Sequence, residues 1–222
     1  MSGYFENVIN MKNVFIEETF NTLYMVVITA IISGVIGLLL GVILVLKGDR
    51  GISENKFIYS ILDKLINFFR AMPFIILIAI ISPITRALIG TTIGENAAIV
   101  PLVFGTVPFF AKQVETALHS VEPGVIEAAQ AMGLNKREIV MDVYLREALP
   151  SLVRVSSITL ISLIGLSAMA GVVGAGGLGK VAISMGHQRF RGDVTLVATA
   201  LIMVLVYGIQ WVGNIIVKKV TH

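Results

Sequence analysis

The sequence predicts an all-α integral membrane protein with about five transmembrane helices, and three observations lead to this fold class. Of the 222 residues, 56% are hydrophobic and only 14% are charged, whereas a soluble globular domain carries about 25% charged residues. Uncharged runs that reach the roughly 20 residues of a membrane-crossing helix recur along the chain. No polar linker separates two halves, so we expect a single membrane domain over residues 1–222.

The clearest spans come from three runs that contain no charged side chain. These runs are Thr19–Leu46, Val155–Gly179 and Val194–Val217. Because the hydrocarbon core of a bilayer disfavours charges, the runs predict transmembrane helices over about residues 19–46, 151–175 and 194–217.

Two further spans are predicted from shorter runs. Ala71–Thr85 and Asn96–Ala111 are uncharged, but each is too short to cross a bilayer alone. Extended by the neighbouring turns, they become helices over about residues 57–82 and 96–118. The charged residues included in this way lie near helix ends, where we expect long basic side chains to reach back to the membrane surface.

The distribution of basic residues favours an external N-terminus and a cytoplasmic C-terminus, because cytoplasmic loops are enriched in Lys and Arg. In this orientation the inner set is larger than the outer set, although the outer group near Lys180 argues the other way. The inner set is Lys47, Arg50, Lys56, Lys64, Lys136, Arg137, Arg146, Lys218 and Lys219, and the outer set is Lys12, Arg86, Lys180, Arg189 and Arg191.

Glycines recur within two of the predicted spans. Since glycine has no side chain, it lets membrane helices approach closely. We interpret these glycines as sites of packing within the chain, with a seam between two copies as the alternative. They are Gly34, Gly37 and Gly41 in the first span and Gly165, Gly171 and Gly174 in the fourth.

Residues 120–150 form a polar segment between two spans, and we expect two short helices there on the cytoplasmic side. Pro123 suits the first position of a helix because its missing N–H would be unpaired there anyway. Gly133 can end that helix, and Asn135 with Glu138 has the spacing of a capping box that begins the next one. The expected helix–turn–helix knob suits insertion into a groove on a partner protein.

The same segment carries a motif. Glu127-Ala128-Ala129, then Gly133, then Val143-Tyr144-Leu145 resemble the EAA loop of bacterial ATP-binding-cassette (ABC) importer permeases. In that family the loop is the coupling helix that docks on the cytoplasmic ATPase subunit. The family pattern has a proline where this chain has Arg146. The resemblance implies a type I ABC importer fold, and it implies ATPase coupling by Glu127, Ala128, Ala129, Met132, Gly133 and Ile139.

Further motifs are similar to the methionine importer permease subgroup, over nearly the whole chain from about Thr19. The similarity implies methionine as the cargo, with another amino acid or small solute as the alternative. The motifs are Arg70-Ala71-Met72-Pro73-Phe74, Pro108-Phe109-Phe110, Ser167-Ala168-Met169-Ala170-Gly171, Gly176-Gly177-Leu178-Gly179 and Gln188-Arg189.

The resemblance also implies the partners of a permease in the bacterial plasma (inner) membrane. These are a cytoplasmic ATP-binding ABC subunit, an extracytoplasmic substrate-binding protein, a second copy of the chain in a homodimer, and the lipid bilayer. The sequence has no G-x-x-x-x-G-K-[ST] loop to cradle phosphates. We therefore expect ATP to bind to the partner subunit, and this chain to bind no cofactor and to be no enzyme.

Met169 lies between two alanines in the fourth predicted span, near Ser162 and Ser167. The plain interpretation of Met169 is an ordinary packed side chain. The functional interpretation is a hydrophobic constriction that closes the translocation pathway when two copies meet. We assign Met169, Ser162 and Ser167 to the lining of the pathway as a hypothesis.

Other function classes have less support. The net charge of +3 is spread over helix ends, so we expect no nucleic-acid partner. An ion-coupled secondary transporter or channel needs ionisable groups deep in the membrane, and the three uncharged spans have none. No catalytic constellation is visible that would favour a membrane enzyme or assembly factor.

Two patterns resemble ligand sites without the required context. Gly174–Gly179 fits G-x-G-x-x-G, but a predicted apolar helix precedes it instead of the strand that dinucleotide binding requires. We interpret it as a sharp turn at the membrane surface. His119, His187 and His222 stand alone and the chain has no cysteine, so we expect no metal site.

Overall fold

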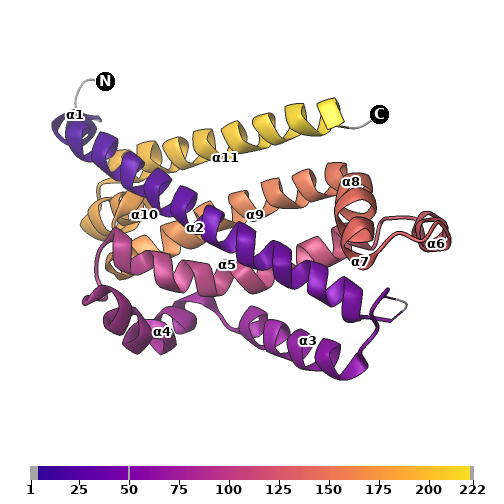
Figure 1. The fold of residues 1–222 in the computed structure, drawn as a ribbon. Helices are drawn as coiled ribbons and strands as arrows, with labels where there is room; N and C mark the ends of the chain where they lie inside the picture. Colours follow the sequence, from indigo (N-terminus) through magenta and orange to yellow (C-terminus); the bar gives the residue numbers. More distant parts are fainter. Residues whose placement is uncertain (1–4, 50, 221–222) are drawn as a thin grey trace. The chain divides into compact units, whose positions relative to one another are not determined.

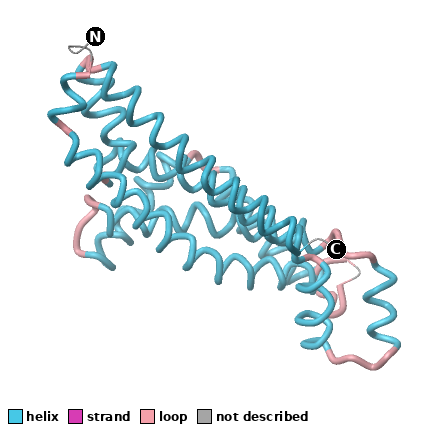
Figure 2. The backbone as a smooth tube through the Cα atoms, turned by 90° about the horizontal axis from the view of Figure 1, so that it is seen from above, coloured by secondary structure: helices cyan, strands magenta, loops and turns pink. Residues whose placement is uncertain are grey.

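The computed structural model describes residues 5–49 and 51–220, so that Arg50 and His222, considered above, lie outside the described residues. The described residues are helical over most of their length, with short loops and no strand (Figures 1 and 2). The elements are α1 (Glu6–Asn10), α2 (Lys12–Lys47), α3 (Lys56–Ala71), α4 (Phe74–Ile89), α5 (Glu95–Leu118), α6 (Pro123–Ala131), α7 (Lys136–Glu138), η1 (Ile139–Tyr144), α8 (Leu145–Glu147), α9 (Leu149–Ala170), η2 (Gly171–Ala175), α10 (Gly177–Lys180), η3 (Val181–Gly186), η4 (His187–Arg189) and α11 (Gly192–Val220).

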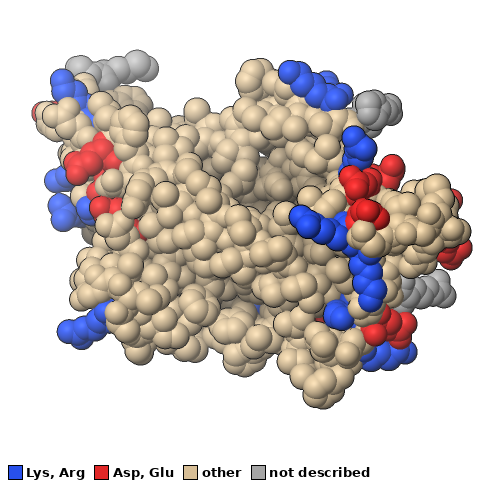
Figure 3. All heavy atoms as spheres, viewed as in Figure 1, with Lys and Arg blue, Asp and Glu red and all other residues tan. Residues whose placement is uncertain are grey.

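Within the described residues, four helical segments are long and apolar enough to cross a membrane. They are α2, α5, α9 continued through η2 (Leu149–Ala175), and α11. Helices α3 and α4 together count as a fifth when they are taken as one broken span. In Figure 3 most of the surface is uncharged, and the Lys, Arg, Asp and Glu side chains lie in separate groups. The all-α membrane fold class is therefore confirmed.

The predicted helix over residues 57–82 differs from the structure, because the chain breaks there into α3 and α4. The break is at Met72 and Pro73, and Pro73 has an extended backbone with φ −57° and ψ 131°. Proline has no N–H to continue a helical ladder, and it disfavours the helical conformation of the residue before it. A helix therefore ends before Pro73 and a new one begins after it, extending to Ile89.

The chain divides into two compact units. Unit 1 consists of Met1–Ile32, Met72–Gly105 and Leu160–Ile209, and unit 2 of Ser33–Ala71, Thr106–Thr159 and Gln210–His222. Helices α2, α5, α9 and α11 each contribute residues to both units.

In unit 2, α2 packs closely on α5 through two glycines. A Cβ atom at Gly37 would lie 2.8 Å from the ring of Phe110, and one at Gly41 would lie 2.6 Å from the side chain of Val114. Gly34 has open space around it. The prediction of packing within the chain is therefore confirmed for Gly37 and Gly41 and does not hold for Gly34.

In unit 1, a buried carboxylate on α2 holds the glycine-rich segment that follows α9. The Glu18 carboxylate accepts hydrogen bonds from the backbone N–H of Gly177, at 2.6 Å, and from the Lys180 ammonium, at 2.7 Å. Because Gly177 is the first residue of α10, the Glu18 carboxylate satisfies a backbone N–H at the start of that helix from a distant part of the chain. Gly174, Gly176 and Gly177 all have positive φ, which confirms the predicted sharp turn.

Candidate coupling site

The helix–turn–helix of residues 123–147, here called the coupling knob, is built by local sequence signals. Pro123 occupies the first turn of α6, after the extended residue Glu122. The helix ends at a glycine in the left-handed region, Gly133 with φ 82°, a conformation that costs glycine little. These features agree with the expected first helix.

The second helix of the coupling knob begins with the predicted capping box. The Asn135 side-chain oxygen accepts from the backbone N–H of Arg137 and Glu138, at 3.0 and 3.1 Å. In return, the Glu138 carboxylate accepts from the backbone N–H of Asn135 at 2.7 Å. Helix α7, η1 and α8 then continue without an intervening loop to Glu147. Since the capping satisfies donors that would otherwise be unpaired, the turn between the two helices is well defined.

The base of the coupling knob is part of the main core of unit 2. Ala129 from α6 and Ile139 and Val143 from η1 are buried in one cluster with Val114 of α5 and Val45 of α2. Tyr144 and Ala148 belong to the same cluster. The knob is therefore anchored by apolar packing to the two helices that lead into unit 2, and Figure 1 shows α6 beyond α7 and α8 at the end of the unit.

The six predicted coupling residues fall into two groups in the structure. Glu127, Ala128, Met132 and Gly133 are exposed, and Met132 exposes 73% of its surface. Ala129 and Ile139 each expose only 2%. The first four can therefore contact a partner directly, whereas the last two can act only by positioning the others.

A groove of about 440 Å³ lies beside α6 in unit 2. The residues that line it include Asp49, Glu127, His119 and Tyr144. Burial raises the pKa of the Tyr144 phenol above its ordinary value, so this wall stays uncharged at neutral pH. The groove gives the exposed face of α6 an acidic border.

Comparison with known proteins decides the family. A model of the family described as binding-protein-dependent transport system inner membrane component matches residues 33–222. The chain belongs to this family. It is therefore a multi-pass inner membrane component of a transport system.

Individual relatives match most of the chain. A protein of Vibrio cholerae named probable D-methionine transport system permease protein MetI is 42% identical over 213 residues, which are 95% of this chain and 94% of the relative. The methionine import system permease protein MetP of Bacillus subtilis is 41% identical over 174 residues, 78% of each chain.

A solved structure supports the fold. A chain in an inward-facing structure of the MetNI methionine ABC transporter has a TM-score of 0.94 and 42% sequence identity, over 96% of this chain and 99% of that one. A chain of an amino acid ABC transporter structure has a TM-score of 0.79 at 18% identity and supports the fold alone. The type I ABC importer fold expected from the EAA loop is confirmed.

The three predicted pathway residues of this family member all lie on α9 in unit 1, but they do not share one face. Met169 is exposed and Ser162 is half-buried, and their separation of seven residues places them on the same side of a helix. Ser167 is buried, and its hydroxyl donates to the carbonyl of Ile164 at 2.8 Å. The pathway hypothesis is therefore compatible with the geometry of Met169 and Ser162 and not with that of Ser167.

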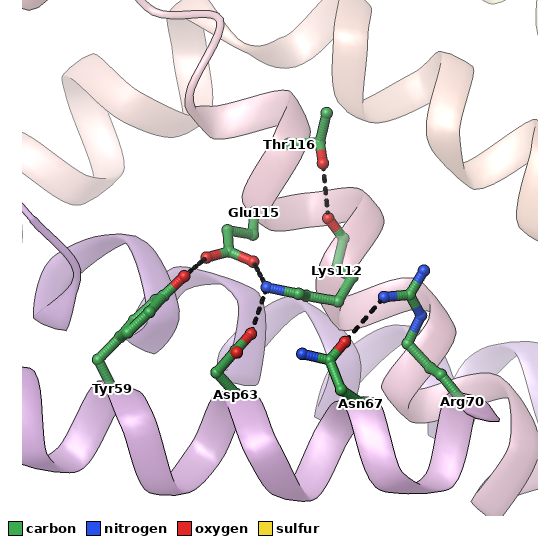
Figure 4. Close-up of polar contacts among 7 residues, drawn as sticks. All are labelled: Tyr59, Asp63, Asn67, Arg70, Lys112, Glu115 and Thr116. Atoms are coloured by element: carbon green, nitrogen blue, oxygen red, sulfur yellow. Dashed lines mark hydrogen bonds and ion pairs between the residues drawn. The ribbon is translucent and has the colours of Figure 1, made fainter. Parts of the chain in front are cut away.

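An ion-pair cluster joins α3 and α5 in unit 2, and the sequence interpretation missed it (Figure 4). The Lys112 ammonium lies 2.6 Å from the Asp63 carboxylate and 2.5 Å from that of Glu115, and the Tyr59 hydroxyl donates to Glu115 at 3.0 Å. The Lys112 ammonium is thus held by two carboxylates, and its expected position near the membrane surface stays a prediction. The spacing of Lys112 and Glu115, three residues apart on one helix, was the available signal.

Proposed function

We propose that the chain is the permease subunit of an ATP-driven ABC importer and that it carries methionine across the inner membrane. The observation that carries the proposal is the coupling knob, with an exposed apolar tip at Met132 on a packed base, in a chain 42% identical to a methionine permease. A second candidate cargo is another amino acid or small solute, because the coupling knob is independent of what is transported.

The proposed assembly consists of two copies of this chain, two cytoplasmic ATPase subunits and an external substrate-binding protein. Two-fold symmetry is the commonest arrangement of oligomers, and one central pathway then lies between two permease chains. ATP binds to the ATPase subunits and none binds to this chain. In the proposed orientation the N-terminus is external and the C-terminus and the coupling knob are cytoplasmic.

Coupling works through different contacts at the coupling knob in two states of the ATPase. A ligand or partner shifts an equilibrium only by its difference in affinity for the two states. When the ATPase subunits close, α6 moves with them, and the buried contacts of Ala129 and Ile139 transmit the movement to α5 and α2 within unit 2. The alternation of inward-open and outward-open states follows from this movement.

The coupling role is tested by placing a charge on the tip of the knob. Met132→Glu is expected to abolish co-purification of the ATPase subunit and ATP-driven uptake, since a carboxylate at a buried apolar contact would be left unpaired. The fold is retained because Met132 is exposed. The matched control is Met141→Glu, an exposed methionine on η1 that is not a predicted contact, and it should assemble and transport normally. Equal behaviour of the two variants would remove the assignment.

Gly133→Glu is expected to have the same effect as Met132→Glu. Because a Cβ at Gly133 would have open space around it, the backbone strain of a non-glycine residue at φ 82°, about 1–2 kcal/mol, is the only cost to folding. Gly133→Ala carries this strain without the charge and separates the two effects. Normal uptake by Gly133→Glu would argue against docking at this turn.

The cargo is tested in proteoliposomes that contain the complete transporter. ATP-driven uptake of labelled methionine is the expected result. Uptake of a different amino acid with no uptake of methionine would remove the methionine assignment and retain the transporter class.

A further inference from the structure

Unit 1 contains a cavity of about 190 Å³, larger than the roughly 150 Å³ cavity that takes up a benzene molecule. It is surrounded by α4, the loop before α5, the first turns of α5 and the segment from Ala170 to Ala175. None of the residues that line it is charged. The cavity is therefore large enough for part of a small organic molecule, and its lining carries no fixed charge.

Two prolines leave backbone carbonyls beside this cavity without their usual helical N–H partner. Pro83 lies inside α4 and has no N–H to donate to the carbonyl of Ala79, four residues earlier. Pro101 lies inside α5 and, for the same reason, cannot donate to the carbonyl of Ala97. Ala79 and Ala97 both line the cavity. Because an alanine side chain is a single methyl group, it shields its own carbonyl little.

Two hydroxyl groups add to these carbonyls. Ser82 and Thr92 line the cavity, and neither hydroxyl makes a hydrogen bond to another residue in the described ranges 5–49 and 51–220. A serine inside a membrane helix commonly donates to the carbonyl four residues earlier. Ser82 makes no such bond in the described residues, so its hydroxyl is available to a ligand. The cavity is thus rich in oxygen acceptors and contains no carboxylate.

Unpaired carbonyls inside a membrane are costly, and they are tolerated where they line a cavity or a binding site. Discontinuous or proline-interrupted helices supply such carbonyls to cations in transport proteins. An ammonium group has three donors and no acceptor, which matches a ring of carbonyl and hydroxyl oxygens. A site without a counter-charge binds weakly, as a site along a pathway must in order to release its ligand.

We propose that this cavity binds the α-ammonium group of an amino acid in transit, through the carbonyls released by Pro83 and Pro101. The apolar walls, which include Ile78 and Val173, accept the carbon chain of the same molecule. The identity of the amino acid as methionine rests on the proposed function, whereas the recognition of an ammonium group does not.

The experiment restores each missing hydrogen bond in turn. Pro83→Ala gives Ala79 its helical N–H partner, and Pro101→Ala does the same for Ala97. The purified complex of permease and ATPase, without ATP or binding protein, is titrated with labelled methionine. Each variant is expected to weaken methionine binding about tenfold, which corresponds to about 1.4 kcal/mol, while the ATPase still co-purifies.

Pro108→Ala is the matched control, because Pro108 is also inside α5 but neither it nor Phe104 lines the cavity. It should bind methionine as the unaltered chain does. If either cavity variant fails to fold, Ala79→Leu tests the same site from an exposed position by filling the cavity, and it should abolish binding. Binding unchanged in Pro83→Ala, Pro101→Ala and Ala79→Leu would overturn the proposal.

Competing ligands identify the recognised group. Methioninol keeps the ammonium and lacks the carboxylate, so it should compete with methionine, whereas 4-(methylthio)butanoate has no ammonium and should not. Competition by sodium chloride with none by methioninol would assign the carbonyls to an alkali cation and overturn the proposal. If the transporter carries another amino acid instead of methionine, a tenfold loss of that amino acid's binding in Pro83→Ala retains the site and removes only the methionine assignment.

Discussion

At the scale of single residues, Lys112 has the most consequential environment. Its side chain exposes 20% of its surface, and that of Glu115 exposes 7%, so both charges have lost most of their hydration. Removing one partner of a buried ion pair costs more than the pair contributes, because the other partner is left unpaired. The Lys112 ammonium pairs with one carboxylate on α3 and one on α5, and its positive charge offsets the repulsion between these two negative charges.

Lys112→Met is therefore expected to destabilise the chain. The expected loss is about 2 kcal/mol, below the value for fully buried pairs because Lys112 is partly exposed, and it corresponds to a fall of roughly 5 °C in the thermal midpoint. The measurement is thermal unfolding of the purified permease in detergent. Lys64→Met, an exposed lysine on the same helix as Asp63, is the control, and adding Asp63→Asn to Lys112→Met should recover part of the loss.

At the scale of elements, the contact between α2 and α5 depends on where glycine is placed. Gly41 is packed so closely that a Cβ would lie 2.6 Å from the Val114 side chain and 2.7 Å from the carbonyl of Ala111. Gly34, two turns earlier on the same helix, has nothing within 4 Å. Both glycines lie in the same uncharged run of the sequence, but only Gly41 is in close contact with another helix in the structure.

Substitution by alanine should separate them. Gly41→Ala is expected to cost about 1–3 kcal/mol through overpacking, whereas Gly34→Ala is expected to be neutral or to stabilise α2 by up to about 1 kcal/mol. The thermal midpoints of the two variants, compared with that of the unaltered chain, give the result. A Gly41→Ala variant as stable as Gly34→Ala would show that α2 and α5 do not approach as described.

The sequence predicts the elements whose signals are local and misses those that depend on distant contacts. Pro123, Gly133 and the Asn135–Glu138 capping box define the coupling knob within a few residues of chain, and the structure has all of them. The break at Pro73 was also a local signal, but the apolar run across it outweighed the proline in the prediction. The burial of Ala129 and Ile139 could not be predicted, because it depends on α2 and α5, which are far away in sequence.

At the scale of the whole molecule, the basic residues define the proposed orientation. The net charge is +3, and most Lys and Arg of the loops belong to the inner set predicted from the sequence. The positive-inside rule assigns this set, together with the coupling knob, to the cytoplasm. Lys180, which argues against this orientation, is paired with the buried Glu18 carboxylate. Because this ion pair within unit 1 offsets the Lys180 charge, we expect Lys180 to influence the membrane orientation of the chain less than an unpaired loop lysine does.

Because the chain contains no cysteine, single introduced cysteines can report the orientation. Gln188→Cys, exposed in the short helix η4, and Thr91→Cys, exposed in the loop before α5, are expected to react with a membrane-impermeant maleimide from outside intact cells. Met141→Cys should react only after the membrane is permeabilised. Labelling of Met141→Cys in intact cells would reverse the orientation.

The most direct measurement concerns the tip of the coupling knob. Met132→Cys in inside-out vesicles is expected to react with an impermeant maleimide when the permease is expressed alone, and to be protected when the ATPase subunit is bound. Reaction from the external side, or equal reaction with and without the ATPase, would contradict the assignment of this knob as the point where the permease meets its ATPase.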